Sequence, residues 1–228
     1  MSSRDYALPD DLVAAHNGKL TAAWIAAEDA AARIDERVRG FALRDGLCQR
    51  LHLCYARAAL RSQHYIVHLE ELVLFDAGAY AGPAHTELVR AADLVKIWRR
   101  AASANADELL AAAMPADTEA TVRQIEVDAR VDPVFDPDWD VAGRIAAWRR
   151  VLRQSRTLPP VLAAAIAWDA WAMINPDERG PWRAPLLASL VLKSRSKVAN
   201  LLLPLDLGVT ACGVTHNALD PIEVRLTA

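Results

Sequence analysis

The sequence predicts an all-α fold of about eight helices. The chain has 228 residues, of which 53% are hydrophobic, and its mean hydropathy is +0.07, so a buried core is expected rather than a disordered chain. Alanine makes up roughly a fifth of the residues against 9 glycines, which favours helices over sandwiches and barrels built on glycine turns. Apolar residues also recur at near-helical spacing along most of the chain.

The first 130 residues are predicted to form an N-terminal helical part. Helical spacing of apolar residues predicts helices over 11–40, 45–66, 69–77 and 86–100. Thr86 is the expected cap of the last of these, and Arg99 and Arg100 lie near its end, where the helix dipole favours cations. Residues 101–130 predict a peripheral helix and a weakly packed connector.

The second half begins after a predicted linker at 131–140, which contains Pro133, Pro137 and four aspartates. Core helices are predicted within 141–210. They comprise 141–154, which Asp140 can cap, a helix from the Pro159–Pro160 pair to Ile174, and one with its body at 186–202. Residues 211–228 predict an irregular tail in which the alternation at 222–226 could form one strand.

Charge and segment composition exclude several classes of protein. With 26 basic and 29 acidic residues the net charge is −3, which suits neither a dedicated nucleic-acid binder nor a polybasic membrane binder. The most apolar segment, 161–174, is too short to span a bilayer and carries Asp169, and the N-terminus shows no secretory signal. Three cysteines without CxxC spacing fit neither a disulfide framework nor a zinc site. We therefore expect a cytoplasmic protein without membrane contact.

Three groups of residues suggest chemistry but favour structural interpretations. His64 and His68 have the spacing of two metal ligands on one helix, yet the HExxH order and a third ligand are missing, so packed or hydrogen-bonded histidines are expected and no metal. The first three positions of a calcium loop are matched, but its glycine and twelfth position are not, so capping and solvation are favoured. The matching residues are Asp136, Asp138 and Asp140, whereas Val141 stands at the glycine position and Ala147 at the twelfth. Trp168 and Trp171 could stack a nucleobase, but more often such a pair packs in a core.

The loop from Asn175 to Arg183 is a more specific candidate. It joins two apolar helices, and the free N–H groups and positive dipole at the start of the second helix suit a phosphate. The candidate anion- or nucleotide-binding residues are Asn175, Arg179, Gly180 and Arg183. The alternative is a structural elbow, in which Pro176 and Gly180 shape the turn and Arg183 pairs with an acidic neighbour.

This loop resembles the signature HPFxxGNGRxxR of the Fic/Doc superfamily. The segment Asn175–Leu186, NPDERGPWRAPL, aligns with it without a gap, and Pro176, Gly180 and Arg183 match. LPPVLAAAIAWDAWAMINPDERGPWRAPLLASLVL, HLEELVLFDA and HTELVRAADLVKIWRR are similar to a family of uncharacterised rhizobial, often plasmid-borne proteins. Those proteins pair a Fic-like helical region with a C-terminal helix-turn-helix DNA-binding domain. The resemblance covers most of residues 10–210 and implies a Fic-like helical bundle.

The resemblance also implies that the usual Fic chemistry is missing. Active Fic proteins use the motif histidine as a base and an acidic residue to hold magnesium on ATP, and they transfer AMP. Here Asn175 stands at the histidine and Arg179 at the acidic position, and Pro181 and Leu186 replace the motif's asparagine and last arginine. We expect no catalytic residue and no cofactor.

The expected function is therefore that of a non-catalytic, degenerate Fic-like module of a bacterial regulatory or DNA-associated protein. Such a module would mediate protein contacts or bind a phosphorylated ligand, and DNA would be bound only through a domain beyond Ala228. The alternative is a divergent nucleotidyl- or phosphotransferase using ATP and magnesium.

Overall fold

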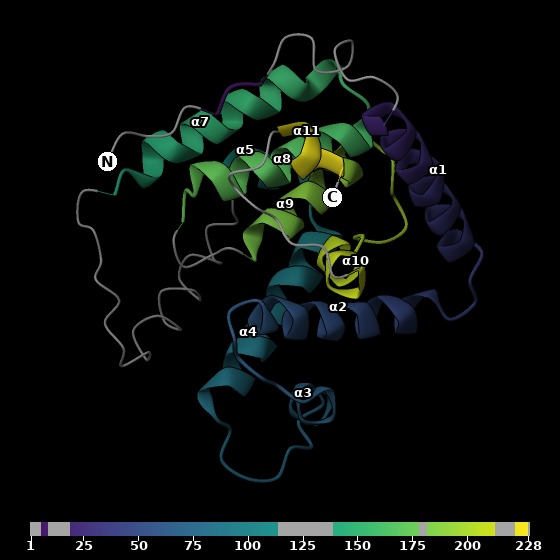
Figure 1. Cartoon of the computed structure of the whole chain (residues 1–228). Coiled ribbons are helices and arrows are strands. Elements are labelled where there is room, and N and C mark those ends of the chain that lie inside the picture. Colours follow the sequence, from purple (N-terminus) through teal and green to yellow (C-terminus); the bar gives the residue numbers. More distant parts are fainter. Residues whose placement is uncertain (1–5, 9–18, 114–138, 178–181, 213–221, 228) are drawn as a thin grey trace. The chain divides into compact units, whose positions relative to one another are not determined.

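The structure is a computed structural model that describes residues 6–8, 19–113, 139–177, 182–212 and 222–227. Within these residues it is helical without strands, which confirms the predicted all-α class (Figure 1). Contacts divide the chain into two compact units, Met1–Ala42 with Asp140–Ala228 as the first and Leu43–Trp139 as the second. The predicted linker lies almost wholly outside the described residues, so the predicted division at 131–140 stays a prediction.

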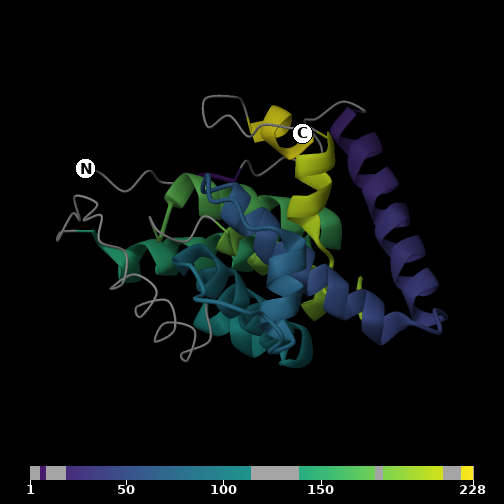
Figure 2. The ribbon, with the colours of Figure 1, turned by 90° about the horizontal axis from the view of Figure 1, so that it is seen from below.

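The second unit contains the helices α2 (Arg44–Arg61), α3 (Leu69–Asp76), α4 (Thr86–Ser103) and α5 (Ala106–Ala112). Helices α2 and α4 pack side by side (Figure 2). The buried rings of Tyr55 and Trp98 stack between them. Arg99 of α4 donates to Gln49 of α2 at 2.7 Å and to both carboxylate oxygens of Asp76 of α3 at 2.6 Å. This bidentate contact ties the three helices together.

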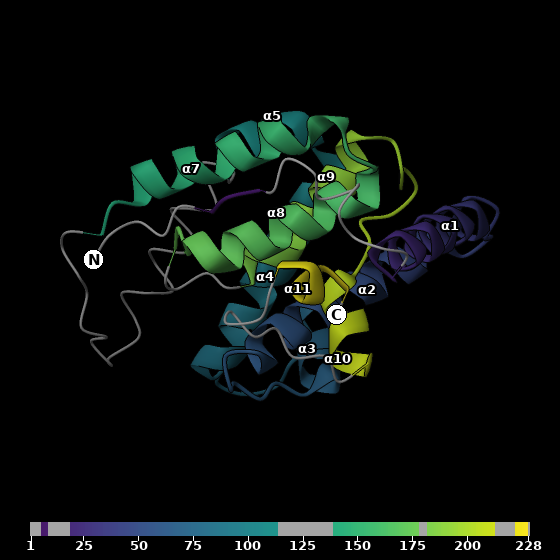
Figure 3. The ribbon, with the colours of Figure 1, turned by 45° about the horizontal axis from the view of Figure 1, so that its top comes forward.

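The first unit contains α1 (Lys19–Arg39), α7 (Val141–Gln154), the 3₁₀ turn η1 (Ser155–Thr157), α8 (Pro160–Ile174), α9 (Arg183–Ser194), α10 (Leu205–Cys212) and α11 (Ile222–Thr227). Helices α8 and α9 pack against each other and are mostly buried, as predicted, and α7 lies along α8 (Figure 3). The Trp148 indole N–H of α7 donates to the Ala167 carbonyl at 2.9 Å, and its ring meets that of Trp171 edge to face. Helix α8 is thus the centre of this unit.

Several predicted details are wrong. Thr86 is the first residue of α4, and the cap is His85, whose imidazole accepts the Leu88 N–H. Residues 222–226 belong to the helix α11 and form no strand. Helix α2 ends at Arg61 and α9 at Ser194, both short of the predicted ends.

The tryptophan prediction holds for one member of the pair. Trp171 is 2% exposed, whereas Trp168 is only half-buried. Because two positions three residues apart do not point in quite the same direction from a helix, the Trp168 ring lies nearer the edge of the packed face.

No helix among the described residues combines the length and apolar character needed to cross a bilayer.

Candidate functional site

The elbow between α8 and α9 is the candidate site, and its first residue is Asn175. This residue ends α8 in the left-handed conformation, with φ 48° and ψ 64°, and its N–H donates to the Trp171 carbonyl at 2.9 Å. Asparagine tolerates this backbone better than most L-residues do. The preceding carbonyl, of Ile174, accepts from the Arg144 guanidinium of α7, a cation at the negative end of the α8 dipole. Asn175 therefore acts as the C-cap of α8.

The elbow is closed by an ion pair between Asp177 and Arg183. The guanidinium of Arg183 contacts an Asp177 carboxylate oxygen, and the two side chains are only 11% and 19% exposed, respectively. Arg183 also lies over the ring of the buried Trp182, at 5.4 Å from its centroid. The first residue of α9 thus has an anion and an aromatic face as partners within the elbow.

This pairing explains how a cation is tolerated at the start of α9. A positive side chain at a helix N-terminus is opposed by the helix dipole, whereas a carboxylate there is favoured. Asp177 supplies that carboxylate beside Arg183. The N-terminus of α9, where the sequence predicted a bound anion, thus has a negative group from the chain itself. Arg179 and Gly180, the other two candidate residues, lie outside the described residues.

The elbow's described residues offer little for proton transfer. Asn175 has no titratable group in the ordinary pH range, and the Asp177 carboxylate is engaged with a guanidinium. A general base must be free to take a proton from its substrate. The described residues of the elbow thus supply an internal ion pair and the cap of α8.

The two histidines considered as metal ligands do not share a helix. His64 has φ 66° in the turn after α2, and His68 is the residue before α3. The premise of one helical face is therefore wrong, because the chain turns between them. Within the described part of the chain, no group of three or more His, Cys, Asp or Glu side chains is placed to hold a metal ion.

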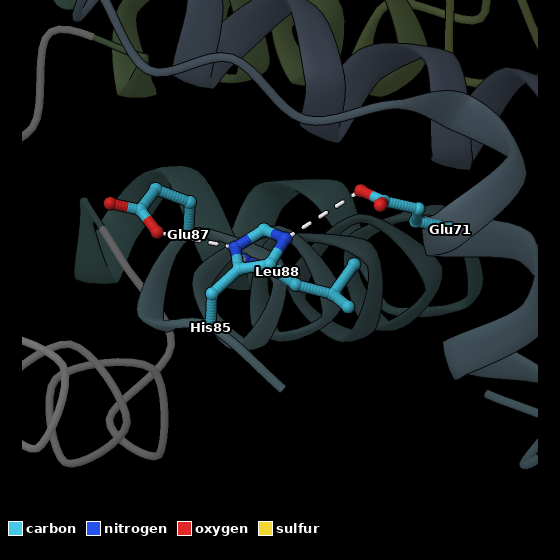
Figure 4. Close-up of polar contacts among 4 residues, drawn as sticks. All are labelled: Glu71, His85, Glu87 and Leu88. Atoms are coloured by element: carbon cyan, nitrogen blue, oxygen red, sulfur yellow. Dashed lines mark hydrogen bonds and ion pairs between the residues drawn. The ribbon is translucent and has the colours of Figure 1, made fainter. Parts of the chain in front are cut away.

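A polar cluster around His85 joins α3 to the start of α4 (Figure 4). Nδ1 accepts the Leu88 N–H at 3.2 Å and lies 3.2 Å from a Glu87 carboxylate oxygen, while Nε2 lies 3.6 Å from Glu71 of α3. Nδ1 accepts the backbone N–H when it carries no proton and donates to Glu87 when it carries one, so its role depends on the tautomer of the ring. Since the ring is 40% exposed, we assign this cluster a capping role.

Of the three aspartates in the calcium-like pattern, Asp136 and Asp138 lie outside the described residues. Asp140 caps α7 by accepting the Gly143 N–H at 2.8 Å, as predicted. A Cβ on residue 143 would lie 2.0 Å from Asp140 Oδ2, so a larger residue there would require the Asp140 side chain to shift.

Two sets of carboxylate contacts in the first unit were not predicted. On α1, Glu28 accepts the Val161 N–H of α8 at 2.7 Å, and Asp35 accepts the N–H groups of Ala199 and Asn200 at 2.9 and 2.7 Å. In the middle of α8, Asp169 is 3% exposed and is bound by side chains from both ends of the chain. The sequence did contain a signal for the Asp169 contacts: a single carboxylate in an apolar helix predicts polar partners elsewhere in the chain, since a buried charge needs them.

Comparison with known proteins connects the chain with uncharacterised rhizobial proteins. Residues 133–228 match the family model described as "Protein of unknown function (DUF1612)". The "Uncharacterized protein y4cF" of Sinorhizobium fredii (strain NBRC 101917 / NGR234) is 27% identical over an alignment 263 positions long. The alignment covers 86% of this chain and 69% of the relative. These matches support the resemblance to an uncharacterised rhizobial family. No solved structure matches the chain.

Proposed function

We propose that this chain is a non-catalytic, degenerate Fic-like helical module of a cytoplasmic bacterial regulatory or DNA-associated protein, with protein contact as its main role. The observation that carries the proposal is the Asp177–Arg183 ion pair, which commits the matched arginine of the motif to a carboxylate of the same loop. The elbow then serves to join α8 and α9.

The chemistry of the neighbouring positions supports the same conclusion. A Fic-type transfer needs a base for the target hydroxyl and an acidic ligand for magnesium. Asn175, the residue at the base position, caps α8, and an arginine stands at the metal-ligand position. Both functions would have to be supplied by other residues.

Incubation with ATP, with and without magnesium, followed by intact-mass measurement tests this proposal. We expect no mass increase of the purified protein and no label from α-labelled ATP on bacterial lysate proteins. Asn175→His is expected to be equally inactive, because Arg179 would still repel the metal. A covalent AMP that disappears in Asp177→Asn would instead establish the alternative, a divergent nucleotidyl- or phosphotransferase using ATP and magnesium.

Binding of a phosphorylated ligand is tested by titration with inorganic phosphate. Because Asp177 and an external phosphate would compete for one guanidinium, Asp177→Asn should bind phosphate more tightly than the parent chain, and Arg183→Ala more weakly. Equal affinity in all three proteins would leave the elbow with a structural role alone.

A candidate contact surface lies on α3 and the turn before it. Ile66, Val73 and Leu74 are 77%, 43% and 47% exposed, and Glu70 and Glu71 stand on the same short helix. Apolar side chains beside carboxylates favour a partner helix that carries leucines flanked by lysines or arginines.

Two synthetic amphipathic peptides with the same leucines, one flanked by lysines and one by glutamates, test this surface by fluorescence anisotropy. The lysine peptide should bind more tightly, and Leu74→Glu should weaken it, whereas Val141→Glu on α7 should not. Equal binding of both peptides, or no effect of Leu74→Glu, would remove α3 as the contact surface.

A further inference from the structure

Asp169 is a buried charge in an otherwise apolar helix. It is the single charged residue of α8, whose sequence is PVLAAAIAWDAWAMI, and it is 3% exposed. An isolated carboxylate at such a site would lose its hydration without compensation, which costs several kcal/mol in real proteins. Its partners therefore offset the cost of burying this charge.

Those partners come from opposite ends of the chain. The Tyr6 hydroxyl donates to Asp169 Oδ2 at 2.6 Å. From α11, Arg225 donates through Nε to Oδ1 at 2.6 Å and through Nη2 to Oδ2 at 2.9 Å. One carboxylate thus accepts three hydrogen bonds from two segments that are 163 residues before and 56 residues after it.

The protonation states of both donors suit this arrangement. Burial and the adjacent carboxylate raise the pKa of Tyr6 well above its usual range, so the phenol keeps the proton that it donates. Hydrogen bonds to Asp169 also raise the pKa of Arg225, whose side chain is only 10% exposed. The fork of the guanidinium matches the two carboxylate oxygens, the geometry in which such pairs are strongest.

Arg225 lies on a very short helix, α11. It is six residues long, too short to be stable as an isolated helix, and it packs against α1 and α8 (Figure 3). Its described side chains, Ile222, Arg225 and Leu226, are half-buried. The contact of Arg225 with Asp169 therefore ties this short helix to α8.

We propose that Asp169 is a latch that holds Tyr6 and α11 against α8 together, so that loss of the guanidinium contact releases both segments while α8 and α9 stay packed. The coupling follows from the shared acceptor. Once Arg225 leaves, the carboxylate has lost its bidentate cation and draws in water, and water then competes for the Tyr6 hydroxyl. Loss of the Tyr6 hydroxyl alone leaves the bidentate ion pair intact, so it is expected to release residues 6–8 and not α11. This device does not depend on whether the elbow binds an anion.

Hydrogen exchange of the intact chain, followed by mass spectrometry, tests the latch. In Arg225→Met, peptides covering 6–8 and 222–227 should exchange at least about tenfold faster, with α8 and α9 unchanged. Tyr6→Phe should accelerate exchange at 6–8 and leave 222–227 protected. Arg225→Lys, which keeps the charge and loses the fork, should fall between the parent and Arg225→Met.

The matched control is Asp35→Asn, which weakens a different carboxylate contact in the same unit and should leave both segments protected. Unchanged protection of 222–227 in Arg225→Met would overturn the proposal, because α11 would then be held by apolar packing. Equal loss of protection across α8 and α9 would also overturn it, since Asp169 would then support the whole core.

Discussion

Replacing Trp148 by alanine should destabilise the first unit more than any change at the elbow. The ring is fully buried, its edge meets the Trp171 ring at a centroid distance of 5.1 Å and an angle of 90°, and its N–H donates to the Ala167 carbonyl at 2.9 Å. A Trp→Ala change in a core costs about 3–5 kcal/mol. The lost edge-to-face pair and hydrogen bond each add about 1 kcal/mol. We expect a total of about 5–7 kcal/mol, a large fraction of the stability of a typical domain.

Two companion variants separate these contributions in urea unfolding followed by far-ultraviolet circular dichroism. Trp148→Phe keeps an aromatic edge and loses the indole N–H, so it should cost about 1–3 kcal/mol. Trp168→Ala removes a half-buried ring and should cost clearly less than Trp148→Ala. Equal costs for Trp168→Ala and Trp148→Ala would refute the assignment of the core face of α8.

Further predictions concern one hydrogen bond between helices, one backbone conformation and one buried histidine. Glu28→Ala removes the carboxylate that accepts the Val161 N–H and should cost about 1–2 kcal/mol, whereas Asp29→Ala, an exposed neighbour on the same helix, should stay within about 0.5 kcal/mol in urea titrations. Asn175→Ala should cost about 1–2 kcal/mol because of the left-handed backbone, and Asn175→Gly should cost less; equal thermal midpoints would contradict this. Burial lowers the pKa of His52 to about 4, so its contribution to stability is complete above pH 6.5, the ordinary histidine value, and declines as the pH falls toward 4, by at most about 1.4 kcal/mol per pH unit. His52→Gln should flatten that part of the pH profile of the unfolding midpoint.

Most helices of the structure could be predicted from local sequence, because helical periodicity and capping act over a few residues. The predicted bounds 141–154 agree with α7, the predicted bounds 159–174 agree with α8 to within one residue, and the Asp140 cap is present. Errors occurred where local signals were ambiguous. The five-residue alternation at 222–226 is too short to specify a strand, and packing against α1 and α8 places it in a helix.

At the candidate site, the sequence indicated that Arg183 would meet either a phosphate or an acidic neighbour, but it could not decide between them. Both options use the same residue types at the same spacing. Only the fold brings Asp177 into contact with the guanidinium and places Asn175 as the cap of α8.

By itself, the sequence determined the all-α class and the apolar helices at the centre of the chain, since these follow from composition and periodicity. Only the tertiary structure decided which ring of the tryptophan pair is buried and which distant residues neutralise Asp169. A pairing across 163 residues leaves no local pattern, because burying the charge of Asp169 costs free energy that its partners must offset, and the folded chain decides which residues lie close enough to do so.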